Sequence, residues 1–195
     1  MDWQSQVAQA REGDVDAYAA VVRQFGDMAR GYAYSLLGDF HLAEDAAQEA
    51  FVQAYRDLPM LSAPRAFPGW LKRIVFKYCD RLTRGKRPPL TTLDEAARIA
   101  GAEPDPSAEA ARREMAETVL AAVAALPKRE RAVAALFYVN GYSRRTIAEF
   151  LDVPLTTVDD RLHAARRLLR EKMAKDAVDE QISRKIQENM DAADW

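Results

Sequence analysis

The chain has one cysteine, Cys79, and only two histidines, His41 and His163, among its 195 residues. A single cysteine excludes an internal disulfide and is compatible with a reducing cytosol. The two histidines fall in different expected domains, and no phosphate-binding loop, metal-ligand cluster or nucleophile beside a base accompanies them. We therefore expect no catalytic residue, no metal and no cofactor, which makes an enzyme the least favoured class of function.

Long apolar runs are also missing. No segment is long enough to span a bilayer, and the chain does not begin with a signal peptide. We therefore expect a cytoplasmic protein without membrane insertion. Runs of β-branched residues are few and alanine is frequent, which favours an all-α fold. A chain of this length can bury the cores of one or two small domains.

The formal net charge of −2 conceals strong local clusters of charge. Basic residues gather at 65–87 and 161–175, whereas acidic residues gather at 39–49, at 94–117 and in the tail. For binding to nucleic acid, such clustering matters more than the sum of the charges.

The segment 141–170 is typical of two short helices joined by a tight turn. Ser143 is a suitable N-cap, and apolar residues then recur at helical spacing as far as Leu151. Pro154 disfavours a helical conformation at the residue before it, so we expect the second helix to begin at Thr156 or Thr157. The pattern predicts a helix-turn-helix whose second helix enters a DNA major groove.

The later half of that second helix is basic, which suits contact with phosphates. Its basic residues are Arg161, His163, Arg166, Arg167 and Arg170. A helical hairpin with a solvated basic face would show the same pattern, and this stretch alone does not separate the two interpretations.

Amphipathic helices are expected along the first 84 residues, at 1–13, 15–25, 27–37, 39–58 and 67–84. The inward residues expected from the spacing include Val15, Tyr18, Val21, Val22, Phe25, Tyr55 and Leu82. The helix at 39–58 carries an acidic outward face with Asp45, Gln48, Glu49 and, nearby, Arg56. This face is either simply solvated or a docking face for a basic partner helix.

The helix at 67–84 combines aromatic and basic side chains at three- and four-residue steps. The stripe consists of Trp70, Arg73, Lys77, Arg81 and Arg84, with Phe67 and Phe76 beside it. Such a stripe suits unstacked bases and a phosphate backbone. The alternative is a basic surface with snorkelling side chains and Trp70 in the core, and the stripe itself leaves both open.

A change of composition divides the chain. Residues 85–108 are rich in Pro, Gly and charge and lose apolar periodicity, which indicates a linker between domains at 1–84 and 109–172. A helix from 109 to Leu126 and another from Lys128 to Tyr138 precede the helix-turn-helix. The extension 173–195 has an apolar stripe at every fourth residue and is expected to be helical, either packed on the domain or acting as a regulatory segment.

Several motifs agree in order and spacing with one family. They are GDVDAYAAVVRQFGDMARGYAYSLLGDFHLAEDAAQEAFVQAYRDL, FPGWLKRIVFKYCDRL and LPKRERAVAALFYVNGYSRRTIAEFLDVPLTTVDDRLHAARRLLRE. Together they cover nearly everything from about residue 10 to residue 172, and in them the chain resembles the extracytoplasmic-function sigma factors of the sigma-70 family. The resemblance implies a two-domain promoter-recognition subunit of RNA polymerase, with sigma region 2 at 1–84 and sigma region 4 at 109–172.

The resemblance also implies roles for individual residues. Contact with the clamp coiled coil of polymerase falls to Asp45, Gln48, Glu49, Phe51 and Arg56. Contact with the minus-ten element, including capture of a flipped base by the loop 60–66, falls to Met60, Leu61, Ser62, Arg65, Phe67, Trp70, Arg73, Lys77, Arg81 and Arg84. Contact with the minus-thirty-five element falls to Arg144, Arg145, Thr156, Thr157, Asp159, Asp160, Arg161, His163, Arg166 and Arg167. Region 4 would also touch the polymerase flap, and an anti-sigma factor or another regulatory protein is a further candidate partner.

Two features depart from the family pattern. Asp159 and Asp160 occupy the recognition helix, where they could cap the helix together with Thr156, accept from a cytosine amino group, or weaken binding by repelling phosphates. The loop 60–66 contains Pro64 and lacks the usual glycine, so its base preference does not carry over. The second interpretation of the whole chain is a stand-alone helix-turn-helix regulator, which leaves the acidic helix and the basic aromatic helix without a role.

Overall fold

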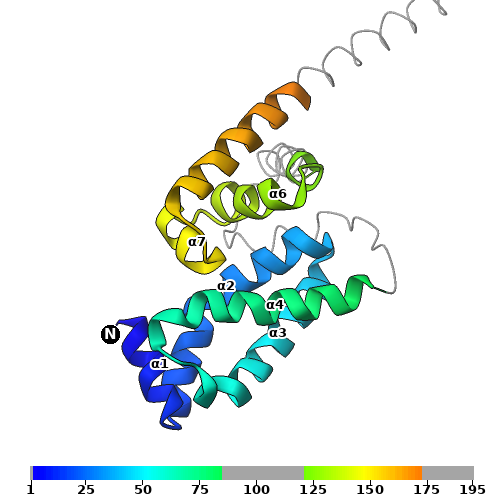
Figure 1. Ribbon diagram of the computed structural model, residues 1–195. Helices are drawn as coiled ribbons and strands as arrows, with labels where there is room; N and C mark the ends of the chain where they lie inside the picture. Colours follow the sequence, from blue (N-terminus) through cyan, green and yellow to red (C-terminus); the bar gives the residue numbers. More distant parts are fainter. Residues whose placement is uncertain (1, 85–120, 173–195) are drawn as a thin grey trace, which may run out of the picture.

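The computed structural model describes residues 2–84 and 121–172, and all their regular structure is helical, as the sequence predicts (Figure 1). The first part contains α1 (Trp3–Arg11), α2 (Val15–Leu37), α3 (Phe40–Asp57) and α4 (Phe67–Thr83). The second part contains α6 (Lys128–Ala134), α7 (Arg144–Leu151) and a helix over 155–172. The predicted linker at 85–108, most of the helix predicted from 109 to Leu126, and the extension at 173–195 lie outside the described residues.

The long helix α2 begins at a side-chain cap and ends at a glycine. The carboxylate Oδ1 of Asp14 accepts from the backbone N–H of Ala17 at 2.9 Å, and Gly38 closes the helix with a left-handed φ of 70°. The predicted break between 25 and 27 is wrong, since α2 runs straight through Gly26. A glycine costs at most about 1 kcal/mol inside a helix, and burial of Phe25 and Met28 on either side offsets that cost.

Helices α2, α3 and α4 pack together around one apolar core, with α1 against α2. Asp39 caps α3 by accepting from the N–H of Leu42 at 3.0 Å. Two short 3-10 turns, Leu58–Met60 and Pro64–Ala66, then lead into α4. The hydroxyl of Tyr18 donates to the Phe51 carbonyl at 2.5 Å, and burial raises the pKa of that phenol. This bond ties α2 to α3 inside the core.

Three residues that the spacing placed inward are exposed instead: Val15 at 63%, Tyr55 at 43% and Leu82 at 41%. Val15 and Leu82 lie in the terminal turns of α2 and α4, where no neighbouring helix covers them. The ring of Tyr55 packs against Tyr18 at 4.8 Å between centroids but leaves its outer side uncovered. Helical periodicity identifies a face, but not how far along a helix that face stays covered.

The helix-turn-helix is present with its expected cap. Ser143 Oγ accepts from the N–H of Thr146 at 3.1 Å and starts α7, and Asp152 ends it with a left-handed φ of 56°. The second helix begins at residue 155, slightly earlier than predicted. Before α7, helix α6 continues into a π-helical turn, Ala135–Val139, in place of the regular helix expected up to Tyr138.

The two parts of the molecule pack against each other. Helix α7 lies on α4, and α6 with its π-helical turn lies on α2 (Figure 1). The rings of Tyr32 and Phe150 meet edge to face with centroids 5.7 Å apart, and a single apolar core runs from α2 and α4 into α7. The sequence predicts two domains joined by a linker, and in the described residues the two parts also pack against each other.

Candidate nucleic-acid and protein interfaces

The acidic face predicted on α3 lies at the surface. Asp45, Gln48 and Glu49 are exposed, and within 2–84 and 121–172 neither carboxylate forms an ion pair. Asp45 and Glu49 line one side of a groove between α3 and α4, with Tyr78 and Arg81 on the other side. Carboxylates on an open helical groove suit a basic partner helix.

Two residues predicted beside this face differ in their placement. Arg56 is exposed at the end of α3, but Phe51 is only 8% exposed and its carbonyl accepts from Tyr18. Phe51 therefore supports the helix from within and does not present its ring to a partner. Val52, which is 47% exposed, is an apolar residue that α3 does present on the side of Asp45 and Glu49, and the helical spacing from those two residues would have identified it.

The loop between α3 and α4 has an exposed tip on a buried base. Met60 is 83% exposed, and Ser62 and Arg65 are also exposed. Leu61 and Phe67 are buried at 3% and 0%. The buried pair anchors the loop, so three of the four site residues predicted in the loop 60–66 lie at the surface, and Phe67 at the start of α4 does not.

The cations of α4 share a helical face but have different partners. Arg81 lies by the acidic groove, with its guanidinium 5.5 Å from the Tyr78 ring centroid, whereas Arg73 points towards α7 and meets the Asp152 carboxylate at 3.5 Å. Arg84 pairs with Asp80 at 2.6 Å one turn earlier. Lys77 is exposed and forms no ion pair with the described residues. Of the predicted basic stripe, Arg81 therefore lies towards α3 and Arg73 towards α7.

The aromatic part of the stripe is divided as well. Trp70 is half-buried and packs on Phe67 with ring centroids 6.0 Å apart, so it belongs largely to the core. Phe76 is 50% exposed and is the aromatic side chain that α4 offers for stacking.

Sequence reasoning missed one cation on α4, Lys72. Its ammonium donates to the Leu151 carbonyl at 3.3 Å. Burial lowers the pKa of Lys72, an effect that Arg73 and Arg161 reinforce and that Asp152 opposes. Lys72 falls outside the three- and four-residue steps of the stripe, so only the packing of α7 reveals it.

The second helix of the helix-turn-helix exposes most of the residues predicted for the minus-thirty-five element. Thr156, Asp160, His163, Arg166 and Arg167 are exposed, and Thr157 and Arg161 are partly exposed. The Nε of Arg166 donates to the Tyr138 hydroxyl at 2.8 Å, and Arg167 pairs with Glu171 at 3.1 Å. On α7, Arg145 pairs with Glu149.

Asp159 has a specific partner. Its Oδ1 accepts from the guanidinium of Arg144 at 2.9 Å, across the turn between the two helices. The predicted cap with Thr156 would need the helix to begin at that residue, but Thr156 already lies inside the helix. Of the two aspartates, only Asp160 has its carboxylate free of ion pairs among the described residues.

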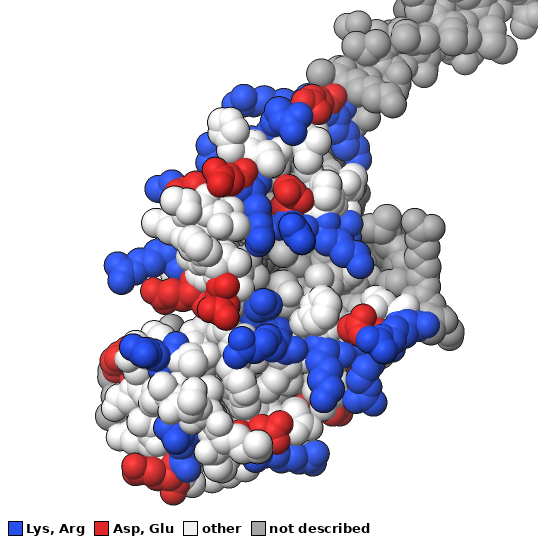
Figure 2. Space-filling view, in the orientation of Figure 1, with Lys and Arg blue, Asp and Glu red and all other residues white. Residues whose placement is uncertain are grey.

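Basic side chains gather over the far end of α4 and over the second part of the molecule (Figure 2). Acidic side chains at the lower edge of the second part face basic ones over α4, which agrees with the contact between Asp152 and Arg73. Within 2–84 and 121–172, no group of histidines, cysteines and carboxylates is arranged to hold a metal ion. In the same residues no helix is long and apolar enough to cross a membrane.

Comparison with known families matches both parts of the chain. Residues 21–87 match the model for sigma-70 region 2, and residues 116–169 match the model for sigma-70 region 4. The ECF RNA polymerase sigma factor SigW of Bacillus subtilis is 33% identical over 179 residues, covering 86% of this chain and 94% of that protein. The chain belongs to the extracytoplasmic-function sigma factors.

Other relatives agree with this assignment. The RNA polymerase sigma-H factor of Pseudomonas aeruginosa is 30% identical, covering 85% of this chain and 91% of its own. Among solved structures, one of CnrH in complex with the cytosolic domain of CnrY has a TM-score of 0.62 at 26% identity, covering 90% of this chain and 99% of that one. A sigma factor RpoE bound to the anti-sigma factor NepR from Bartonella quintana shares the fold, with a TM-score of 0.52 at 19% identity over 82% and 98% of the two chains.

As an extracytoplasmic-function sigma factor, the protein is a transcription initiation factor and not an enzyme. It binds core RNA polymerase and promoter DNA. The alternative of a stand-alone regulator is not supported, because both sigma regions match and the match extends along most of the chain.

Proposed function

We propose that the acidic face of α3 is the part of this sigma factor that docks on the clamp coiled coil of polymerase. The observation that carries this assignment is the exposure of Asp45, Gln48 and Glu49 on one face of α3, with no ion pair to either carboxylate from the described residues. A basic partner helix would meet two carboxylates that no cation of the described residues pairs with. Val52 and Arg56 complete the docking surface.

The minus-ten element is bound by the tip of the α3–α4 loop and by α4. Met60, Ser62 and Arg65 receive a flipped base, and Phe76 offers a face for stacking. Opening a duplex costs a few kcal/mol per base, and stacking contributes about 1–3 kcal/mol per base. Arg73, Lys77 and Arg84 hold the phosphates of the displaced strand.

The minus-thirty-five element is bound by the second helix of the helix-turn-helix. Thr156, Thr157 and Asp160 lie near its start, where a recognition helix meets base edges. Arg161, His163, Arg166 and Arg167 contact phosphates further along. Asp159 is a positioning residue, because it holds the guanidinium of Arg144 across the turn and does not itself read a base.

The domain boundaries follow from these roles. We place sigma region 2 at 1–84, a linker at 85–108 and sigma region 4 at 109–172, which contacts the flap as well as DNA. Since polymerase and promoters are in the cytoplasm, the protein works there. The solved complex of the sigma factor RpoE with the anti-sigma factor NepR supports an anti-sigma protein as a regulatory partner.

Reconstitution with core RNA polymerase tests these assignments. The wild-type protein should co-elute with core enzyme and start transcription from a template carrying both promoter elements. Reversing the charges of Asp45 and Glu49 should abolish co-elution, while replacing Lys77 should spare co-elution and weaken opening of the promoter. Loss of both steps in both variants would show that α3 and α4 do not divide the work as proposed.

A further inference from the structure

The contact between α7 and α4 engages Arg73, which is proposed to hold minus-ten DNA, and its neighbour Lys72. Arg73 is held by Asp152 at 3.5 Å, and Lys72 donates to the Leu151 carbonyl at 3.3 Å. Arg161 of the recognition helix lies close enough to influence the pKa of both Lys72 and Tyr32. Cations of α4 and of the recognition helix therefore lie close together where the helix-turn-helix packs on α4.

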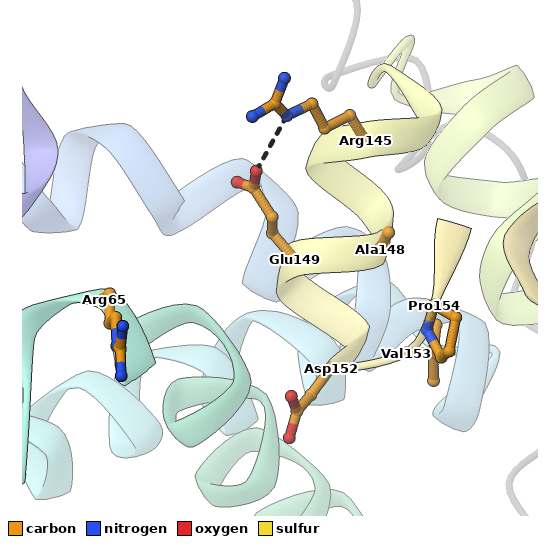
Figure 3. Close-up of a pocket in the computed structure, with 7 residues that line it drawn as sticks. All are labelled: Arg65, Arg145, Ala148, Glu149, Asp152, Val153 and Pro154. Carbon is orange, nitrogen blue, oxygen red and sulfur yellow. Dashed lines mark hydrogen bonds and ion pairs between the residues drawn. The ribbon is translucent and has the colours of Figure 1, made fainter. Parts of the chain in front are cut away.

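The same boundary joins residues proposed for different promoter elements. One groove is lined by Arg65 of the minus-ten loop and by Arg145 of the helix-turn-helix (Figure 3). On DNA, the two elements lie about 25 base pairs apart, or about 85 Å at the 3.4 Å spacing of bases along a strand. A molecule with both residues in one groove cannot contact both elements, so the described arrangement is not the promoter-bound one.

Two glycines allow this close approach. A Cβ on Gly69 of α4 would lie 2.8 Å from the Cβ of Asp152, and a Cβ on Gly31 of α2 would lie 2.9 Å from the Cγ of Asn140. Figure 3 shows Asp152 at the end of α7, directed towards the ribbon of α4. Each glycine is a notch in the surface of the first domain that receives one side chain of the second.

Apolar packing contributes most of the free energy that holds α7 against α2 and α4. The ring of Phe150 is fully buried and meets Tyr32 across the boundary. The ion pair between Arg73 and Asp152 is more than half exposed at both side chains, and such pairs contribute at most about 1 kcal/mol. The glycine notches bring the apolar surfaces together, and the charged groups at the rim then occupy Lys72 and Arg73.

We propose that this chain inhibits itself, without a second protein, by docking its helix-turn-helix on α4 through the notches at Gly31 and Gly69. In the docked state, Asp152 takes the place of a DNA phosphate at Arg73, and the Leu151 carbonyl does so at Lys72. Promoter binding requires undocking, so the apparent affinity for minus-ten DNA is reduced by the fraction of molecules that are docked. This inference rests on the assignment of α4 to minus-ten DNA.

The decisive variant is Gly69→Ala, because the Cβ of Asp152 cannot rotate away from the added methyl group. Gly31→Ala tests the second notch. Gly26→Ala is the matched control, since Gly26 also lies within α2 but an added Cβ there meets nothing within 4 Å. All three changes raise helix propensity, so loss of the docked state cannot be ascribed to a weakened helix.

Docking is measured in the full chain by energy transfer between dyes on cysteines introduced at Gln24 and Arg170, both of which are exposed. The native Cys79 is 1% exposed and should not take up dye. Wild type and Gly26→Ala should show one short distance, and Gly69→Ala should shift to a longer one. Gly31→Ala should shift less, because its added Cβ meets only the amide end of the Asn140 side chain, which can rotate away. An unchanged distance in Gly69→Ala would overturn the proposal.

The second readout is binding of a single-stranded minus-ten oligonucleotide. We expect about tenfold tighter binding by Gly69→Ala than by wild type, which corresponds to a chain that is docked about nine-tenths of the time. Undocking without any gain in affinity would overturn self-inhibition. If the undocked protein fails to bind the oligonucleotide at all, with or without core polymerase, the assignment of α4 fails while the measured distance still decides whether docking occurs.

Asp152→Asn keeps the experiment decisive if Gly69→Ala does not fold. Asparagine tolerates the left-handed conformation at this position, and the change removes the charge beside Arg73 while preserving shape. A partial shift to the longer distance, with a gain in oligonucleotide affinity of about threefold, supports the proposal. Identical distance and affinity to wild type would contradict it.

Discussion

Helices α3 and α4 lie side by side in one domain, yet their functional faces differ in how accessible they are. The carboxylates of Asp45 and Glu49 on α3 are free of ion pairs from the described residues. On α4, Lys72 and Arg73 are engaged by the end of α7. With the roles proposed for the two helices, this difference predicts an order of events in which polymerase is bound while part of the DNA-binding surface is still covered.

The largest effect is expected from the open face. Asp45→Lys with Glu49→Lys should weaken association with core polymerase by about 100-fold or more, because buried interfacial charge pairs are worth several kcal/mol. Co-elution and titration with core enzyme measure this. The matched control is Glu12→Lys with Asp16→Lys, which makes the same change of net charge at exposed residues away from the groove. Equal loss in both variants would mean that only total charge matters.

A smaller effect is expected on α4, at a cation that α7 leaves free. Lys77→Ala should weaken binding of minus-ten DNA by about three- to tenfold and reduce the salt dependence of binding by about one phosphate contact. Binding titrations at several salt concentrations measure both quantities. Arg23→Ala, at an exposed position on α2, is the control. A salt slope that is unchanged in Lys77→Ala would remove this residue from the DNA-binding surface.

These two helices also show how far the sequence leads. The helices and the cap at Ser143 follow from spacing and residue type, because both are local properties. Contacts between domains are not local. The pattern therefore did not reveal the engagement of Lys72 or the partner of Asp159, each of which depends on a residue distant in the sequence. For Phe51 the helical spacing predicts the inward position that the structure has, whereas the family resemblance assigned it to the polymerase contact.

The helix-turn-helix allows a finer comparison between its two adjacent aspartates. Asp159→Asn should weaken minus-thirty-five binding by about threefold, because Arg144 loses the carboxylate that orients it. Asp160→Asn should alter the preference among base pairs and leave Arg144 in place. Binding to a set of duplexes changed at single positions separates the two effects. In a double-mutant cycle, Asp159→Asn should have no further effect once Arg144 is replaced by Ala.

The smallest effect is expected on the free energy of unfolding at alkaline pH, where two buried groups titrate, Tyr32 of α2 and Cys79 of α4. Burial raises the pKa of Tyr32 from 10.0 to about 12 and that of Cys79 from 9.0 to about 12. Between pH 9 and 12 the unfolded chain therefore releases protons that the folded chain keeps, so the free energy of unfolding falls as the pH rises through this window. Urea titrations at pH 8, 10 and 11 measure the fall. A free energy of unfolding that stays constant would show that these groups are not buried in solution.

The contrast between α3 and α4 is tested most directly by measuring two affinities of one variant. Wild type and Gly69→Ala are each titrated with the isolated clamp coiled coil of RNA polymerase and, separately, with the minus-ten oligonucleotide. The isolated coiled coil separates the α3 face from the flap contact of region 4, and we expect equal affinity for this fragment and tighter binding of the oligonucleotide by Gly69→Ala alone. If the substitution changed both affinities equally, or left the affinity for the oligonucleotide unchanged, the proposed difference between an open α3 and a covered α4 would be contradicted.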